Sequence, residues 1–477
     1  MTNILVIGTG PLFAPDVTVF NGQALRTWHL VQPLLERGHH PDLVVLAVEG
    51  VALPPSPDGN VTVMRRGDFS YRALTTNDHA VVLRELQAIH DSKAYDCIVA
   101  INNNAAVLAC RLQSRLPIWA DLNGFIMGEA QSRGRVYGSD EYLLHFWRRE
   151  AVPLRRADRF STASYKQMYA TLGELGSVGR LNRHNCEHPF VTVIPEAAYE
   201  EFLRPESYPS LPTYRGKLFP SDAFAVLWSG GFNTWTDAGT LAAALSLAME
   251  QVPKLRFVAT GGPIPGHDER TYNEFLEAME MTGFTERCHM LGWVEARELF
   301  PLYKDCDIGL NIDALNYETM FGARNRLTNM LAAGLPVLTT LGTEVTEIVD
   351  EAGLGYVVPI GDVQGFADAL VRAARHPAER KTMGIRAREY CQRHFTYAAT
   401  TRQLVRWADS PSRAPDNDER LLRCPDADDL PSVALNPLEE HLNAADPDHL
   451  AALRRDSADL AAIRSKFLFR LYKTFFR

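Results

Sequence analysis

Short apolar runs alternate with longer amphipathic segments along most of the chain. This is the pattern of strands buried on both faces of a sheet with helices between them. In the first half, the predicted helices are 21–37, 80–90 and 105–114, and the predicted strands are 4–7, 43–47, 97–101, 118–121, 159–163 and 191–194. The repeated order of strand, helix and strand predicts a doubly wound α/β domain.

The same alternation restarts after residues 205–220, a stretch rich in Pro, Ser and Gly that is typical of a linker. The later strands are predicted at 223–229, 256–260, 288–291, 308–312, 337–340 and 356–358, with helices at 237–249, 295–304, 325–333 and 363–374. We therefore predict an α/β fold with two doubly wound, Rossmann-like domains, 1–204 and 221–385, that face each other across a cleft. A crossover helix region follows at 386–409.

The last part of the chain has a different character. Residues 410–450 are rich in Pro, Asp and Glu without periodicity, which predicts an acidic flexible linker. Residues 451–477 are expected to form an amphipathic terminal helix, with one apolar face (Ile463, Phe467, Leu471, Phe475) and one basic face (Lys466, Arg470, Lys473, Arg477). Such a helix can lie on an anionic membrane, or it can dock on the acidic surface of the protein itself.

Charge and cysteine content narrow the class of protein. A net charge of −9 over 477 residues argues against a nucleic-acid partner. The seven cysteines are scattered without a C-x-x-C pair, as in proteins of a reducing compartment. The N-terminus lacks the features of a signal peptide, and no apolar run approaches the roughly 20 residues that span a bilayer. We expect a cytoplasmic protein, with peripheral attachment to the inner face of the cell membrane as an option for the terminal helix.

Glycines follow several predicted strands. Gly8-Thr9-Gly10 is half of a dinucleotide fingerprint, but Phe13 stands where the third glycine belongs and Glu49 comes too late for the acidic residue. This pattern fits a tight turn, or a turn whose backbone faces a ligand. Two glycine pairs, Gly230-Gly231 and Gly261-Gly262, end neighbouring strands of the second domain, where open α/β sheets bind ligands.

Two arginines stand at the predicted start of helix 325–333. The helix dipole disfavours Arg324 and Arg326 there, and a bound diphosphate would reverse that penalty. The same residues could instead be solvated or paired with Glu318. We take the anion site as the leading interpretation, because a local rule is broken where a phosphate would repair it.

The segment 318–336 resembles the donor-binding segment of the retaining glycosyltransferases of family 4, which have the GT-B fold. Gly334-Leu335-Pro336-Val337 is similar to the end of that segment, and Gly261-Gly262 and Gly292-Trp293-Val294 resemble its earlier glycine motifs. The resemblance implies that Glu318 contacts the donor sugar, that Arg326 holds the diphosphate and that Asn329 faces the ribose. Donor contacts are also expected from Gly230, Gly231, Asn233, Gly261, Gly262, Gly292, Trp293, Val294 and Arg324.

This sequence departs from the family pattern at three places. Asn329 stands where the family has a second Glu, and the interval from Glu318 to Asn329 is three residues longer than usual. Residues 230–237 contain no Lys or Arg, so Arg324, Arg326 and helix ends must supply the charge for phosphate, and Trp235 is a candidate for stacking on a ring.

The first domain offers candidates for the acceptor side. Asp121 closes an apolar strand and is the candidate for acceptor orientation or base work, and Glu129, His145 and Glu150 are weaker ones. Gly10, Asn21, Gly22 and Arg26 are expected near the acceptor or the phosphates. Asp305-Cys306-Asp307 has the form of a metal motif, but it precedes a strand, so we expect a structural role and neither a metal nor a cofactor.

These observations predict an enzyme, a glycosyltransferase that moves a sugar from a nucleoside diphosphate sugar to a glycan, lipid-linked or small-molecule acceptor. The family likeness implies retention of configuration, and charge stabilisation by arginines and N–H groups would make a metal unnecessary. The alternatives are a sugar-nucleotide epimerase, an NAD-dependent oxidoreductase and a non-catalytic scaffold of a polysaccharide assembly complex.

Overall fold

A computed structural model describes residues 1–12, 22–47, 59–204 and 213–417 of the chain. Residues 1–418 form one compact unit, which contains two sheets. Asn21, Glu49, the linker 410–450 from residue 418 onward and the terminal segment 451–477 lie outside the described residues. None of the described helices is long and apolar enough to cross a membrane.

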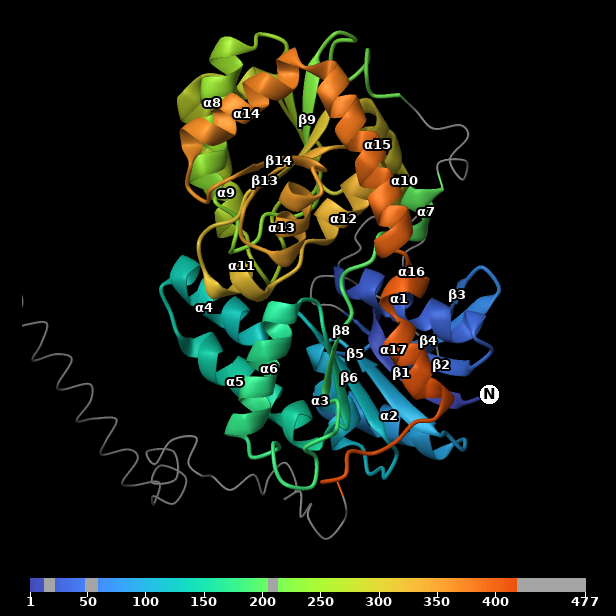
Figure 1. Ribbon diagram of the computed structural model, residues 1–477. Coiled ribbons are helices and arrows are strands. Elements are labelled where there is room, and N and C mark those ends of the chain that lie inside the picture. The colour runs from blue at the N-terminus through green and yellow to red at the C-terminus, as the bar shows by residue number, and fades with distance from the viewer. Residues whose placement is uncertain (13–21, 48–58, 205–212, 418–477) are drawn as a thin grey trace, which may run out of the picture. The chain divides into compact units, whose positions relative to one another are not determined.

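The first sheet has eight strands in the order β3-β4-β2-β1-β5-β6-β7-β8. All neighbouring pairs are parallel except β3 and β4, which form an antiparallel hairpin. The strands are β1 (Asn3–Gly10), β2 (His40–Ala47), β3 (Val61–Arg66), β4 (Phe69–Leu74), β5 (Cys97–Ile101), β6 (Ile118–Asn123), β7 (Arg159–Thr162) and β8 (Val191–Val193). The central strands β1 and β5 are buried almost throughout, because helices cover both faces of the sheet (Figure 1).

The helices of this domain are α1 (Gly22–Glu36), α2 (His79–Asp91), α3 (Asn103–Arg111), α4 (Ile126–Tyr137), α5 (Glu141–Arg156), α6 (Tyr165–Ser177) and α7 (Glu200–Leu203). Sequence patterning predicted α1, α2 and α3 but not α4, α5 and α6. In α4, glycines at 128 and 134 interrupt the apolar spacing, and in α5 several large apolar side chains, including Leu143 and Trp147, are exposed. The α4 helix therefore lacks the simple apolar stripe on which the prediction depended, whereas the buried residues of α5 lie near its C-terminal end.

The second sheet has six strands in the order β11-β10-β9-β12-β13-β14, all parallel. They are β9 (Phe224–Trp228), β10 (Leu255–Ala259), β11 (Cys288–Met290), β12 (Ile308–Asn311), β13 (Val337–Thr340) and β14 (Gly355–Val358). The helices are α8 (Ala238–Gln251), α9 (Arg270–Thr282), α10 (Ala296–Asp305), α11 (Tyr317–Phe321), α12 (Asn325–Ala332), α13 (Glu344–Glu351), α14 (Val363–Arg375) and α15 (Pro377–His394). The predicted strands are all present, and this sheet confirms the second Rossmann-like domain.

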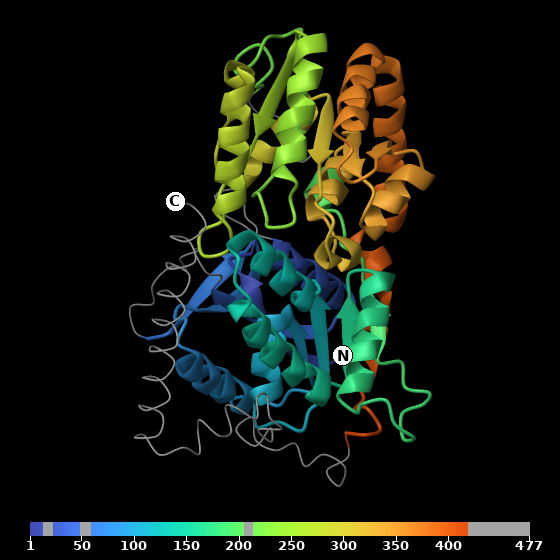
Figure 2. The ribbon, with the colours of Figure 1, turned by 90° about the vertical axis from the view of Figure 1, so that its left-hand side faces the viewer.

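The described chain ends by returning to the first domain. After α15, the short helices α16 (Tyr397–Thr400) and α17 (Arg402–Asp409) contact α1. Trp407 packs against Trp119 of β6, with ring centroids 5.4 Å apart, and Thr2 donates a hydrogen bond to the carbonyl of Ala408. Figures 1 and 2 show this orange-to-red segment passing from the second domain to the first.

The glycine motif Gly8-Thr9-Gly10 is not the turn that the sequence predicted, because β1 continues through Gly10. A Cβ at Gly8 would lie 2.5 Å from the methyl group of Thr27, and one at Gly10 would lie 2.6 Å from Val45. The two glycines therefore allow α1 and β2 to approach β1 closely. At Gly10 the close neighbour on the Cβ side is strand β2.

Candidate functional site

The two glycine pairs of the second domain meet at the carboxyl edge of its sheet, as the sequence predicted. A Cβ at Gly261 would lie 2.4 Å from the carbonyl carbon of Gly230, and Gly261 has a φ of +75°. The carbonyl of Gly262 accepts a hydrogen bond from the N–H of Phe232, and the carbonyl of Gly292 accepts one from Gly261. Three strand ends, those of β9, β10 and β11, are thus joined through bare backbone that a ligand can approach.

Other predicted donor residues lie around these loops. The indole of Trp293 donates to the carbonyl of Pro263 at 3.2 Å, and Val294 is partly buried against the core. The N–H of Asn233 donates to the hydroxyl of Thr236, and the Asn233 side chain is half-buried. These contacts fix the loops to one another, so the shape of this edge is already set in the protein alone.

Arg326 lies at these glycine loops. Its Nη2 donates to the carbonyl of Gly231 at 2.6 Å, and its guanidinium stands 4.2 Å from the centre of the Trp228 ring. Its Nη1 is buried without a hydrogen-bond partner, and no carboxylate of the described residues forms an ion pair with it. Burial lowers the pKa of Arg326 to about 10. The side chain is therefore a cation whose counter-ion is missing among the described residues.

Arg324 has the opposite environment. Its guanidinium donates to both carboxylate oxygens of Glu318, at 3.0 and 2.8 Å, and its Nε donates to Asp313 at 2.9 Å. Although burial opposes it, these two carboxylates raise the pKa of Arg324. The expectation that Arg324 offers free charge to a diphosphate is wrong for this structure, because Glu318 and Asp313 already neutralise its guanidinium. The pairing with Glu318 is the alternative that the sequence analysis left open.

Glu318 is held by the same ion pair. It lies in α11, is 4% exposed and uses both oxygens to accept from Arg324. Asp313, which completes the network just after β12, was not singled out from the sequence. Its position at the carboxyl end of a strand could have identified Asp313 as a candidate, because the same argument selected Asp121.

Asn329 of α12 lies on the side of the crossover. Its side-chain oxygen accepts a hydrogen bond from the N–H of Tyr199 at 2.9 Å, and its side chain is buried. It lies with Glu196, His29 and Tyr397 around a packing gap that has no room for a water molecule. The amide oxygen is thus engaged by the segment that joins the two domains.

Asp121 does not face open space, in contrast to the prediction. It is 0% exposed and forms a bidentate pair with Arg26, at 2.7 and 3.1 Å, and it accepts from the hydroxyl of Ser161 at 2.6 Å. Arg26 is equally buried and also donates to the carbonyl of Pro195. Two residues predicted for the acceptor side therefore neutralise each other inside the first domain.

The two domains touch through α4 and the start of α1. A Cβ at Gly128 of α4 would lie 2.9 Å from the backbone of Glu318, and one at Gly22 would lie 2.7 Å from the amide of Asn325 at the start of α12. The neighbouring Glu129 lies at this junction, and burial together with Glu318 raises its pKa to about 8. Glu129 forms no hydrogen bond or ion pair with the described residues, and its raised pKa shifts it toward the protonated form in comparison with an ordinary glutamate.

Of the remaining candidates, Glu150, Asp305 and Asp307 are engaged by other residues of the protein. Glu150 is buried, accepts from Asn103, and its pKa is raised by burial and by Glu174, whereas His145 is exposed. Asp305 accepts from the N–H groups of Tyr214 and Arg215. Asp307 pairs with Arg215 and Arg380. Across residues 1–12, 22–47, 59–204 and 213–417, no group of three or more His, Cys, Asp or Glu side chains has the arrangement of a metal site.

Two Rossmann-like domains, with glycine loops and a basic residue at the carboxyl edge of the second sheet, define the class: this is a protein of the GT-B fold. Sucrose-phosphate synthase from Thermosynechococcus elongatus superimposes with a TM-score of 0.65 at 17% identity, covering 86% of this chain and 100% of that one. HepE from Anabaena in complex with UDP and glucose gives 0.60 at 16% identity, with the same coverage of both chains. At these identities the likeness concerns the fold.

The sequence of the second domain is similar to known proteins. Residues 223–376 match the model of the family described as glycosyl transferases group 1. D-inositol 3-phosphate glycosyltransferase from Saccharomonospora viridis is 27% identical over 218 residues, which are 45% of this chain and 48% of that protein. The chain thus spans about half the length of this curated relative. Residues 223–376 are therefore similar to the glycosyl transferases of group 1, and the resemblance stated from the sequence is confirmed.

Proposed function

We propose that the protein transfers a sugar from a nucleoside diphosphate sugar to an acceptor hydroxyl. The observation that carries the proposal is Arg326, whose guanidinium has no ion-pair partner among the described residues and lies where the glycine loops of β9 and β10 meet. A diphosphate placed there would satisfy the free Nη1, supply the missing negative charge and accept from loop N–H groups. The structural relatives with UDP or a UDP-sugar bound, HepE among them, support this class of donor.

The residues suggest how the reaction would be assisted. Charge builds up on the leaving diphosphate in the transition state, and Arg326 and the loop N–H groups would stabilise it without needing a metal. Glu318, held in place by Arg324, would bond the hydroxyls of the donor sugar. We infer retention of configuration from the family likeness alone.

For the acceptor side we propose Glu129 in place of Asp121, the residue predicted from the sequence. It comes from the first domain, stands next to Glu318 and is not engaged by an arginine ion pair among the described residues. We propose that it orients the acceptor hydroxyl and exchanges a proton with it, a task suited to a group whose pKa of about 8 lies near neutrality.

The test is binding and turnover with the full chain. Calorimetry with UDP, GDP and their glucose and mannose conjugates should detect at least one ligand, and Arg326→Gln should weaken it about 100-fold. Release of the nucleoside diphosphate, followed with and without added acceptors, separates a transferase from a non-catalytic scaffold. Binding that is unchanged in Arg326→Gln would remove the proposal, and binding without turnover with any acceptor would favour the scaffold.

We further propose that the protein acts in the cytoplasm and touches an anionic membrane through its basic and apolar C-terminal segment, residues 463–477. This proposal rests on the sequence of that segment. Vesicles containing phosphatidylglycerol should sediment the full chain, and those of phosphatidylcholine alone should not. Equal sedimentation after Lys466, Arg470 and Lys473 are changed to Glu would contradict it.

A further inference from the structure

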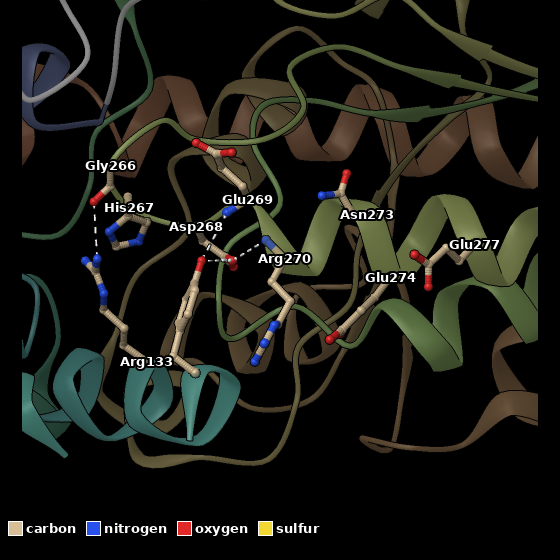
Figure 3. Close-up of a pocket in the computed structure, with 10 residues that line it drawn as sticks. Arg133, Gly266, His267, Asp268, Glu269, Arg270, Asn273, Glu274 and Glu277 are labelled. Carbon is tan, nitrogen blue, oxygen red and sulfur yellow. Dashed lines mark hydrogen bonds between the residues drawn. The ribbon is translucent and has the colours of Figure 1, made fainter. Parts of the chain in front are cut away.

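A groove with a volume of about 600 Å³ lies beside the candidate site, between α4 of the first domain and the loop that leads from β10 into α9 (Figure 3). Two bridges across the domains form its wall. Arg133 donates to the carbonyl of Gly266 at 3.2 Å, and the hydroxyl of Tyr137 donates to Asp268 at 3.1 Å. The groove is therefore a product of both domains, and neither domain has it alone.

Asp268 is a buried residue of this lining. It is 0% exposed, and its Oδ1 accepts from Tyr137 and from the N–H groups of Arg270 and Thr271, at 3.0 and 3.3 Å, where α9 begins. Its Oδ2 is buried and receives no hydrogen bond in the described part of the chain. A buried carboxylate oxygen without a donor is costly, so a ligand that brings a donor would be favoured here.

Arg133 leaves a complementary group unused. Its Nη2 donates to Gly266 and to the hydroxyl of Tyr142, whereas its Nε is buried without an acceptor among the described residues. One free acceptor and one free donor thus line the same groove. A hydroxyl group can donate to the first and accept from the second, which neither a phosphate nor an ammonium group can do.

The charges around the groove point to the same class of ligand. Its lining has four carboxylates and two guanidinium groups, and the lining residues from α9 and its approach are Asp268, Glu269, Arg270, Asn273, Glu274 and Glu277. The excess of carboxylates disfavours a phosphate. His267, also in the lining, has its pKa lowered to about 4 by burial and by Arg133, so it is a neutral hydrogen-bonding group. Mixed donors and acceptors of this kind suit a sugar with several hydroxyl groups.

The groove adjoins the proposed reaction centre. The ring of His267 lies 6.1 Å from the ring of Trp235, and the guanidinium of Arg324 stands 5.2 Å from the centre of Trp235 on the way to Glu318. We infer that the groove binds a sugar unit of a glycan acceptor, away from the unit that reacts. This inference rests on the proposed function, and it names an oligosaccharide as the class of acceptor.

The experiment uses the full chain and a set of neutral tetrasaccharides built from glucose, mannose and N-acetylglucosamine, with binding measured by calorimetry in the presence of UDP. We expect at least one to bind, and the exposed pair Asn273→Ala with Glu274→Ala to weaken it at least tenfold while leaving UDP affinity unchanged. Glu280→Ala is the matched control, because Glu280 is an exposed glutamate of the same helix outside the groove lining.

The inference is overturned if none of the tetrasaccharides binds, or if the double variant binds as the control does. It is also overturned if only putrescine, a diammonium probe, responds to the double variant, since the groove would then be a cation site. Tetrasaccharide binding that depends on Asn273 and Glu274 in a protein that fails to bind UDP would uphold the groove and reject the proposed donor instead.

Discussion

Arg324 and Arg326 stand two positions apart at the start of α12 and should respond to the same substitution in opposite ways. Arg326→Gln removes a cation without an ion-pair partner among the described residues. Arg324→Gln removes the partner of both Glu318 and Asp313. We expect the first change to cost ligand binding but not folding, and the second to cost folding. Glutamine keeps the length and polarity of the side chain, so charge is the main difference in both variants.

The magnitudes follow from burial and pairing. Loss of Arg324 leaves two buried carboxylates unpaired, which destabilises proteins by about 3–5 kcal/mol. Lowering of the Arg326 pKa to about 10 corresponds to a penalty of at most about 3 kcal/mol at neutral pH, because the ordinary value lies above 12 and the side chain retains some exposure. Arg326→Gln should therefore leave the ligand-free protein as stable as before or more stable. With a diphosphate, it should lose about 3 kcal/mol of binding, or about 100-fold in affinity.

Urea unfolding without ligand and calorimetry with the best nucleoside diphosphate measure the two effects separately. The expected result is a crossed pattern: Arg324→Gln lowers the free energy of unfolding, and Arg326→Gln lowers only the affinity. The reasoning is refuted if Arg326→Gln unfolds the protein as readily as Arg324→Gln does. That outcome would mean that Arg326 has a structural counter-ion and that its free Nη1 says nothing about a ligand.

Three further predictions follow from single contacts. The raised pKa of Glu129 means that folding favours its protonated form, so the stability from this group is present at low pH and is lost as the pH rises toward about 8. In unfolding experiments between pH 5 and 8, Glu129→Gln should therefore remove about 1 kcal/mol per pH unit of the decline in the free energy of unfolding. An unchanged slope would contradict the assignment. Asp121→Asn should lower the free energy of unfolding by about 3–5 kcal/mol by leaving Arg26 buried and unpaired, whereas loss of transfer at unchanged stability would restore Asp121 as a catalytic candidate. Gly261→Ala should lower the free energy of unfolding by about 1–3 kcal/mol more than Gly283→Ala does. Both glycines have a φ of +75°, but only at Gly261 would the added Cβ meet backbone within 3 Å. Equal urea midpoints for the two variants would show that the glycine loops can separate.

The two-domain fold was accessible from the sequence because its strands are buried on both faces. The apolar runs 4–7 and Phe224–Trp228 (β9) contain no polar residue. Such runs are typical of parallel strands that are covered on both faces. The helices at the domain junction were not accessible in this way. The α4 helix packs on α11 through Gly128, and a glycine at a close contact resembles a loop when it is read without its partner.

The sequence predicted where candidate residues lie, but it did not predict whether their charges are free or paired. The carboxyl ends of strands correctly indicated where the glycine pairs meet, because backbone geometry alone brings them together. Whether a charged side chain is free or paired depends on residues far away in the sequence. Asp121 is neutralised by Arg26, 95 positions earlier, and no local pattern distinguishes that aspartate from a free one.

Pairing also narrows which residues can do chemistry. Near the junction of the domains, two ion pairs are already formed, Arg26 with Asp121 and Arg324 with Glu318. Their charges hold neighbouring side chains in position but are largely neutralised. Arg326 and Glu129 are the groups there whose pKa values are displaced toward the neutral form and which lack an ion-pair partner among the described residues. Substrates that bring a diphosphate to one and a hydroxyl to the other would relieve both at once. Without substrate, burial disfavours the charged forms of both side chains. This energetic cost is the physical reason to place the donor at Arg326 and the acceptor at Glu129.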